Sequence, residues 1–171
     1  ASGHLATTDA NTDRADITPD GGGEITIDVG AGVCTDAATN NNPAAPQAVV
    51  TYDAAAPTVD IQGEPATRNT TPFSVTFEFS ENVTGFVVGD ITVGNGAAGN
   101  FATTDANTYT ADITPDGVGD ITIDVGAGVR TDAATNNNTA APQAVVTYDA
   151  AAPTVDIQGE PAKRTTTPFS V

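Results

Sequence analysis

The sequence predicts an all-β protein built from tandem copies of one small β-sandwich. Gly and Pro are frequent, with 17 and 11 residues, whereas Met and Trp are absent and Leu occurs only at position 5. This composition favours strands and turns over helices. Short runs that alternate apolar and polar residues recur along the chain, and hydrophobic residues make up 39% of it, which suffices for a thin sandwich core.

A long internal repeat indicates that the same unit is used more than once. Residues 1–75 align without a gap on residues 97–171, a period of 96, and 64 of the 75 aligned positions are identical. The motif TYDAAAPTVD occurs at 51–60 and again at 147–156, where its Ala and Pro residues interrupt the strand pattern. These two motifs are therefore predicted to be connectors between domains.

The connectors predict domain boundaries at Pro57 and Pro153. Residues 57–152 then form one complete unit. Residues 1–56 are the C-terminal part of the preceding repeat, and residues 153–171 are the start of the next. Because these two partial units lack strands, we expect neighbouring repeats to complete them, either in the same chain or head to tail in a fibre.

Period-two alternation places the strands of the complete unit. The strongest pattern runs over residues 73–79, where Phe and Val alternate with polar residues. Residues 109–114 and 120–125 alternate in the same way around the turn sequence TPDGVG, and they are predicted to pair as a hairpin. Further short strands are predicted at residues 58–62, 86–88, 90–93, 101–103 and 143–148.

About seven short strands in one repeat, with turns every 8–12 residues, are typical of an immunoglobulin-like sandwich. The Cys pair and the core Trp of antibody domains are missing, since the chain has one Cys and no Trp. The prediction is therefore an immunoglobulin-like sandwich without a disulfide.

Three stretches of the sequence resemble a known family. They are PFSVTFEFSENVTGFVVGDITVGNG, YTADITPDGVGDITIDVGAGVRTDAATNNN and the connector YDAAAPTVD. These stretches are similar to the bacterial Ig-like repeats of large surface adhesins and biofilm proteins. The resemblance implies export, folding outside the cell, and calcium held at domain junctions by connector carboxylates.

Asp53 and Asp149 match the connector position of that family. The predicted calcium ligands at the two junctions are therefore Asp53 with Asp60 and Asp149 with Asp156, joined by Glu81 and Asn82 from the turn after the Phe-rich strand. The alternative is that these residues are ordinary solvated turn residues. Many relatives carry Gly in a DAAGN loop where this chain reads DAATNNN, so Asp132 and Asn136 are left out of the predicted ligand set.

Charge restricts the partners of the chain. Acidic residues outnumber basic ones by 22 to 5, which gives a formal net charge of −17. Such a chain repels polyanions, so nucleic acid is excluded as a partner. The acidic charge serves solubility, cation binding or both. No apolar run approaches the roughly 20 residues that a membrane-spanning helix needs, so we expect no membrane insertion of this segment.

The residue inventory argues against catalysis. The single His4 corresponds to Asn100 in the complete unit, and the single Cys34 corresponds to Arg130, so the complete unit has no His-based or Cys-based nucleophilic pair. Acidic residues on the predicted strands point outward from a flat sheet rather than into a cleft. Cys34 has no internal disulfide partner, which leaves it incidental or available for a bridge between molecules.

The expected function is structural and adhesive. Nearly identical sandwiches in series form an extended stalk or fibre at a bacterial cell surface. Two alternatives stay open: a module that binds a glycan or a surface protein, and an accessory spacer in a secreted enzyme. Aromatic residues make up only 5% of the chain, which leaves few for stacking on sugars.

Overall fold

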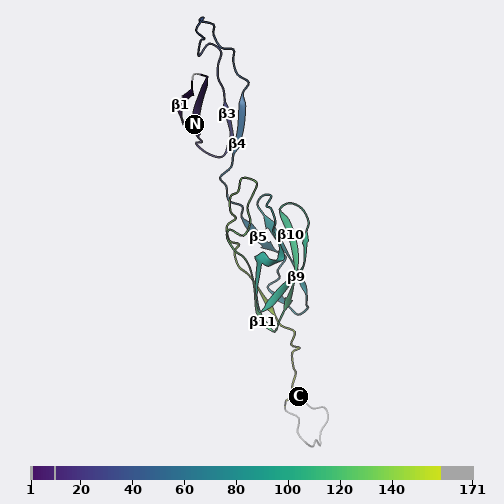
Figure 1. The fold of residues 1–171 in the computed structure, drawn as a ribbon. Helices are drawn as coiled ribbons and strands as arrows, with labels where there is room; N and C mark the ends of the chain where they lie inside the picture. The colour runs from purple at the N-terminus through teal and green to yellow at the C-terminus, as the bar shows by residue number, and fades with distance from the viewer. Residues whose placement is uncertain (1, 10, 159–171) are drawn as a thin grey trace, which may run out of the picture.

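A computed structural model describes residues 2–9 and 11–158, and it confirms the predicted all-β immunoglobulin-like sandwich (Figure 1). In these residues the one helical element is the 3-10 turn η1 (Val88–Asp90). The strands of the first, partial unit are β1 (Ser2–Asp9), β2 (Thr12–Thr18), β3 (Gly23–Ile27) and β4 (Ala48–Tyr52). Those of the complete unit are β5 (Val59–Gln62), β6 (Thr67–Arg68), β7 (Phe73–Phe79), β8 (Ile91–Gly94), β9 (Gly96–Thr103), β10 (Thr108–Pro115), β11 (Gly119–Val125) and β12 (Ala144–Tyr148).

The complete unit consists of two four-stranded sheets. One sheet has the order β5-β7-β10-β9 and the other has the order β6-β12-β11-β8. All neighbouring strands run antiparallel except β6 and β12, which are parallel. Two layers of this kind bury alternate side chains between them, as on β5, β7, β10, β11 and β12.

The core follows the alternation that the sequence predicts. On β7 the residues Phe73, Val75, Phe77 and Phe79 are buried, and the residues between them face outward. Ile121 and Ile123 on β11 meet them from the opposite sheet and are fully buried. Burying side chains of this size stabilises a fold by about 1.5–3 kcal/mol each, which makes this layer the main source of stability.

An aromatic cluster closes one region of the core. The Phe86 ring lies 5.0 Å from Tyr109, 5.1 Å from Phe79 and 5.7 Å from Phe101, measured between centroids. All three pairs are edge-on, an arrangement that the charge distribution of aromatic rings favours. The Tyr109 hydroxyl donates to the carbonyl of Val83 or of Ala106, at 3.3 and 3.2 Å, so its polar end is satisfied inside the core.

The predicted hairpin of residues 109–114 and 120–125 is wrong. The two strands lie in different sheets, where β10 pairs with β7 and β9 and β11 pairs with β8 and β12. The segment from Asp116 to Val118 therefore crosses between layers. Two consecutive strands with inward apolar faces and a Gly-rich turn have the same local sequence pattern in a hairpin and in a crossover, so the pattern could not separate them.

Three other elements differ from the sequence prediction. Residues 86–88 form no strand, because Phe86 turns inward to the aromatic cluster and the chain then enters η1. The strand predicted at 101–103 begins earlier, at Gly96. The two-residue β6 was not predicted, since so short an element carries no periodic signal.

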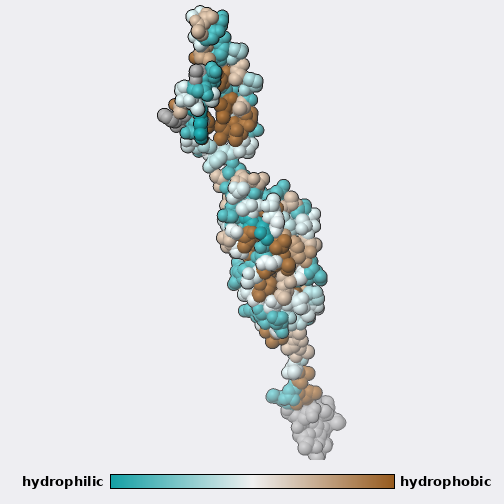
Figure 2. All heavy atoms as spheres, in the orientation of Figure 1, coloured by the Kyte–Doolittle hydropathy of each residue, from teal (hydrophilic) through white to brown (hydrophobic). Residues whose placement is uncertain are grey.

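The first unit repeats only half of this sandwich. By the period of 96, β1 to β4 correspond to β9 to β12, and they pair in the same way, β1 with β2 and β3 with β4. Their inner faces are open. Ile17 is 37% exposed and Val50 is 52% exposed, whereas their counterparts Ile113 and Val146 are 0% exposed. Figure 2 shows hydrophobic side chains at the surface of this unit.

The chain enters the complete unit at one end and leaves it at the other (Figure 1). The connector after β4 approaches the end where the loop of residues 131–139 lies, and the connector after β12 departs from the opposite end. Most of the segment predicted to begin the next repeat, residues 159–171, lies outside the described residues. Across the part of the chain that the structure describes, no helix is long and apolar enough to span a membrane.

Candidate metal centre at the domain junction

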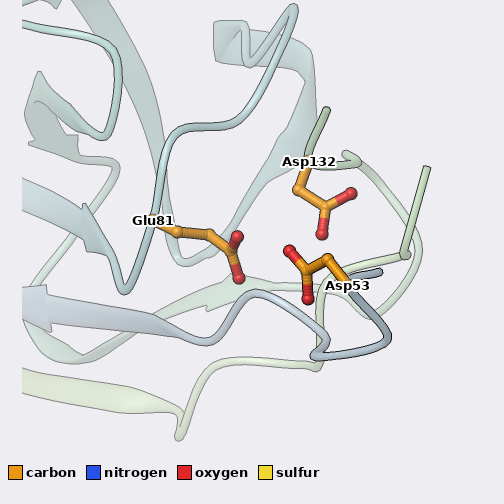
Figure 3. Close-up of side chains that lie close together, drawn as sticks. All are labelled: Asp53, Glu81 and Asp132. Atoms are coloured by element: carbon orange, nitrogen blue, oxygen red, sulfur yellow. The ribbon is translucent and has the colours of Figure 1, made fainter. Parts of the chain in front are cut away.

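Three carboxylates from distant parts of the sequence converge where the connector meets the complete unit. They belong to Asp53, Glu81 and Asp132, and one oxygen of each lies within 4.8 Å of the others. Figure 3 shows the three side chains pointing toward one another. Asp132 is 4% exposed, and the other two residues are half-buried.

Each of the three residues sits on a different backbone element. Asp53 follows β4 directly, and its carboxylate accepts a 2.9 Å hydrogen bond from the backbone N–H of Ala55, which turns the connector. Glu81 lies in the loop that follows β7. Asp132 follows Thr131, whose backbone forms bridges to Thr84 and Asn137. The site is therefore assembled from the connector and two loops of the complete unit.

The loop that carries Asp132 is held by its own side chains. The Asp132 carboxylate accepts bonds from the backbone N–H and from the side-chain amide of Asn136, both at 2.9 Å. Between them Thr135 has a φ of 70°, in the left-handed region that favours Gly. Thr135 thus adopts a turn conformation that Gly takes without strain, and the DAATN sequence forms a closed loop.

The same loop holds the connector. The side-chain amide of Asn136 also donates to the backbone carbonyl of Asp53 at 3.2 Å. The backbone N–H of Thr139 donates to the carbonyl of Pro57 at 2.9 Å. These two bonds hold the connector against the end of the sandwich, and neither of them requires a bound ion.

Asn138 supports this loop from inside. It is 2% exposed, and its amide donates to the carbonyls of Gly126 and Thr139 while its oxygen accepts from the N–H of Arg130. The repeated run of three Asn residues indicated a turn but could not show which of them is buried. Asn42, its counterpart in the first unit, makes the corresponding set of bonds.

The electrostatics of the cluster are asymmetric. Burial raises the pKa of Glu81, and the negative charges of Asp53 and Asp132 raise it further. Burial also disfavours the ionised form of Asp132, but the hydrogen bonds from Asn136, together with those from the backbone N–H groups of Ala134 and Thr135, outweigh this and lower its pKa. Glu81 is therefore the residue of the cluster whose pKa is raised by repulsion from the other two carboxylates.

The predicted ligand residues divide into two groups. Asp53 and Glu81 belong to the cluster, which also contains Asp132, a residue that was left out because of the missing Gly. Asp60, Asp149 and Asp156 do not belong to it, and Asn82, next to Glu81 in the same loop, stays a predicted ligand. Asp60 lies on β5, where its carboxylate accepts from the Gln62 side chain, and Asp149 turns the second connector by accepting from Ala151.

The arrangement has the chemistry of a site for a hard divalent cation. Calcium binds carboxylate oxygens at 2.3–2.6 Å, so ligands on opposite sides of one ion are separated by about 5 Å. The mutual separation of up to 4.8 Å therefore lets all three carboxylates reach a single ion. Such an ion would also neutralise the repulsion that raises the pKa of Glu81.

Other acidic residues of the complete unit have partners of their own. Glu78 accepts from Gln62, Asp112 from Asn100, Asp120 from Thr147 and Asp124 from Gln143, at 2.8–3.0 Å. Asp90 forms a 2.6 Å ion pair with Arg130. These contacts lie on outer sheet faces and in loops, and they account for the carboxylates that the sequence placed on solvated faces.

Comparison with known proteins identifies the family. The profile of the bacterial Ig-like domain matches residues 53–149, more than half of the chain, and covers most of the first connector, all three acids of the junction and the strands β5 to β12. No curated protein and no solved structure shows significant similarity to the chain. The match and the disulfide-free sandwich lead to one assignment: the chain belongs to the bacterial Ig-like domain family.

Proposed function

We propose that the chain is a stretch of a structural, non-catalytic array of Ig-like units on the outside of a bacterial cell, in which calcium joins successive units. Membership of the bacterial Ig-like family supports the structural and extracellular parts of this proposal. The near-identity of residues 1–75 and 97–171 supports the array. Each unit extends the array by about 35–45 Å, given strands of five to eight residues with their loops.

The observation that carries the proposal is the junction cluster of Asp53, Glu81 and Asp132. Three carboxylates within 4.8 Å of one another repel each other when all are ionised, and a divalent cation between them reverses that repulsion. The bond from Asn136 to the Asp53 carbonyl keeps the connector in place for a shared ion. An ion held there would link the exit of one unit to two loops of the next.

The second connector allows the same kind of junction to recur along the array. Asp149 stands in a TYDAAAP motif identical to that around Asp53. The counterparts of Glu81 and Asp132 for that junction would come from the following unit. A stalk of such units would carry an adhesive element away from the cell surface.

The proposal is tested by titrating the full chain with calcium after removal of divalent ions by a chelator. We expect calorimetry to detect one site, the melting temperature to rise, and small-angle scattering to show a stiffer chain. Glu81→Gln and Asp132→Asn are expected to abolish the calorimetric signal, because each removes a ligand charge.

Asp149→Asn is the matched control for Asp53→Asn, because the two residues share the same surrounding sequence. Asp53→Asn is expected to weaken calcium binding, and Asp149→Asn is expected to leave it unchanged. Equal effects of the two substitutions, or a melting temperature that rises equally with sodium chloride at matched ionic strength, would show that calcium only screens the net charge.

A further inference from the structure

The complete sandwich is made of two halves that meet along a seam. The first half is residues 57–94, with strands β5 to β8, and the second half is residues 97–152, with strands β9 to β12. The tight turn at Asn95, with a φ of 57°, joins them. Each sheet takes two strands from each half, so the pairs β7–β10, β8–β11 and β6–β12 lie on the seam, and both halves contribute residues to the core.

The chain holds two versions of the second half. Residues 1–56 correspond to residues 97–152 and differ from them at nine positions. Both versions form the strand pairs of a second half, but only residues 97–152 are covered by a first half. Two nearly identical second halves thus flank the first half of residues 57–94, a situation in which neighbouring units can exchange strands.

Two of the nine differences remove aromatic contacts across the seam. Tyr109 contacts the rings of Phe79 and Phe86 in the first half, and its counterpart in residues 1–56 is Asp13. A carboxylate at this position would be buried among aromatic rings, which opposes pairing. Phe101 contacts Phe86 from the same side, and its counterpart is the smaller Leu5.

Two further differences remove polar contacts across the seam. The guanidinium of Arg130 pairs with Asp90 of the first half, and its counterpart is Cys34, which leaves such an acid without its cation. The N–H of Thr139 donates to the Pro57 carbonyl, and its counterpart is Pro43, which has no N–H. By contrast, Asn100 and Asp120, which also differ between the repeats, bond to Asp112 and Thr147 within the second half.

We infer that these four positions, at Leu5, Asp13, Cys34 and Pro43, are specificity determinants that prevent residues 1–56 from pairing with the first half of the next unit. Every one of them replaces a residue that contacts the first half in the complete unit. The substitutions leave the strand pairs β1–β2 and β3–β4 intact. They determine which first half a second half pairs with, so that each second half pairs with a first half whose seam residues match its own.

The test adds a polypeptide with the sequence of residues 57–94 to the full chain and to a seam variant of it. The seam variant carries Leu5→Phe, Asp13→Tyr, Cys34→Arg and Pro43→Thr, which copies the contacts of residues 97–152. We expect the polypeptide to bind the seam variant about 100-fold or more tightly than the unaltered chain, because a buried carboxylate and a lost ion pair are both relieved. Amide exchange should slow at Ala15 and Ile17, whose counterparts Ala111 and Ile113 pair with Val75 and Phe73.

A matched control variant carries Arg14→Thr, Gly22→Val and Glu24→Asp. The counterparts of these positions are Thr110, Val118 and Asp120. Among the described residues, their side chains form no hydrogen bond, ion pair or ring contact with the first half. The control variant is expected to bind no better than the unaltered chain. Equal binding of the unaltered chain and the seam variant, or failure of the seam variant to bind, would overturn the inference.

A second measurement covers the case in which the free polypeptide self-associates. Residues 57–96 are fused in front of Ala1 of the full chain, with and without the four seam substitutions. Slow amide exchange within residues 1–56 is expected only with the substitutions. Equal protection in both proteins would contradict the role assigned to the four positions.

Discussion

The side-chain amide of Asn136 donates to the backbone carbonyl of Asp53, a residue 83 positions earlier in the chain. The same amide donates to the Asp132 carboxylate at 2.9 Å. One side chain therefore connects the entering connector to an acid of the junction cluster. The connector is short and rich in Ala, so few other groups are available to fix it.

Asn136→Ala is expected to loosen the connector while the sandwich stays folded. It removes two hydrogen bonds, each of which contributes about 1 kcal/mol. Amide exchange around Ala55 should accelerate, and calcium affinity should fall because Asp53 is no longer positioned. Asn40→Ala, in the same loop of the first unit, is the control and should change neither quantity. Unchanged exchange at Ala55 in Asn136→Ala would contradict the role given to this bond.

When no divalent cation is present, Glu81 and Asp132 are expected to change the free energy of unfolding in opposite directions as the pH falls. Glu81 has a pKa above its usual 4.5, so the folded state holds this proton more tightly than the unfolded state does. Its contribution favours folding at low pH and is lost as pH rises from about 4.5 through the raised value. Asp132 has a pKa below its usual 3.8, so its contribution is present above that pH and is lost as pH falls further.

Urea unfolding of the complete unit between pH 3 and pH 7 measures both contributions. Glu81→Gln should remove the gain in stability on acidification toward pH 4.5 and leave the loss below about pH 3.8. Saturating calcium should also remove the gain, because a bound ion keeps Glu81 ionised. An identical profile for Glu81→Gln and the unaltered chain would show that other carboxylates cause the gain.

Thr135→Gly is expected to stabilise the complete unit by about 1 kcal/mol. Thr135 holds a φ of 70°, and Gly adopts this conformation without the steric cost of a Cβ atom. Ala134→Gly is the control, because this neighbour has no positive φ and Gly there should only increase the entropy of the unfolded chain. If both substitutions destabilised the unit equally, the left-handed turn would carry no strain.

Arg130→Cys, the residue found naturally at position 34, is expected to lower the free energy of unfolding by about 2 kcal/mol. It leaves the Asp90 carboxylate, whose side chain is 13% exposed, without its ion pair. Thr110→Arg copies another difference between the repeats and should change stability by less than about 0.5 kcal/mol, since it lies on the outer face of β10. Denaturant unfolding followed by circular dichroism measures both.

The sequence predicted which side chains of a strand are buried, because this follows from the alternation of apolar and polar residues within that strand. The alternation of Phe73 to Phe79 marked an inward face, and the structure buries those residues. The pairing of β10 and β11 with other strands was beyond such reasoning, because Ile113 and Ile121 face inward in a hairpin and in a crossover alike. Sheet membership depends on contacts between distant segments, which local periodicity does not report.

The candidate site was predicted in the same partial way. The family resemblance pointed to Asp53, and proximity to the Phe-rich strand pointed to Glu81. Asp132 was left out because Thr135 stands where Gly was expected, and only the backbone geometry shows that Thr135 adopts the left-handed turn. Asp60 was included because it flanks the Ala-Ala-Ala-Pro segment together with Asp53, and the structure places it on β5, where its carboxylate accepts from Gln62.

The parallel pairing of β6 with β12 determines how the unit responds to tension. The N–H groups of Thr147 and Asp149 donate to the carbonyls of Ala66 and Arg68, at 3.0 and 2.8 Å. A pulling force along the array draws the two strands lengthwise past each other, since the chain enters at one end of the unit and leaves at the other. Both bonds are then loaded together in shear, whereas strands pulled apart from one end would lose their bonds one by one. This short pair of strands is where the unit should resist mechanical extension most strongly.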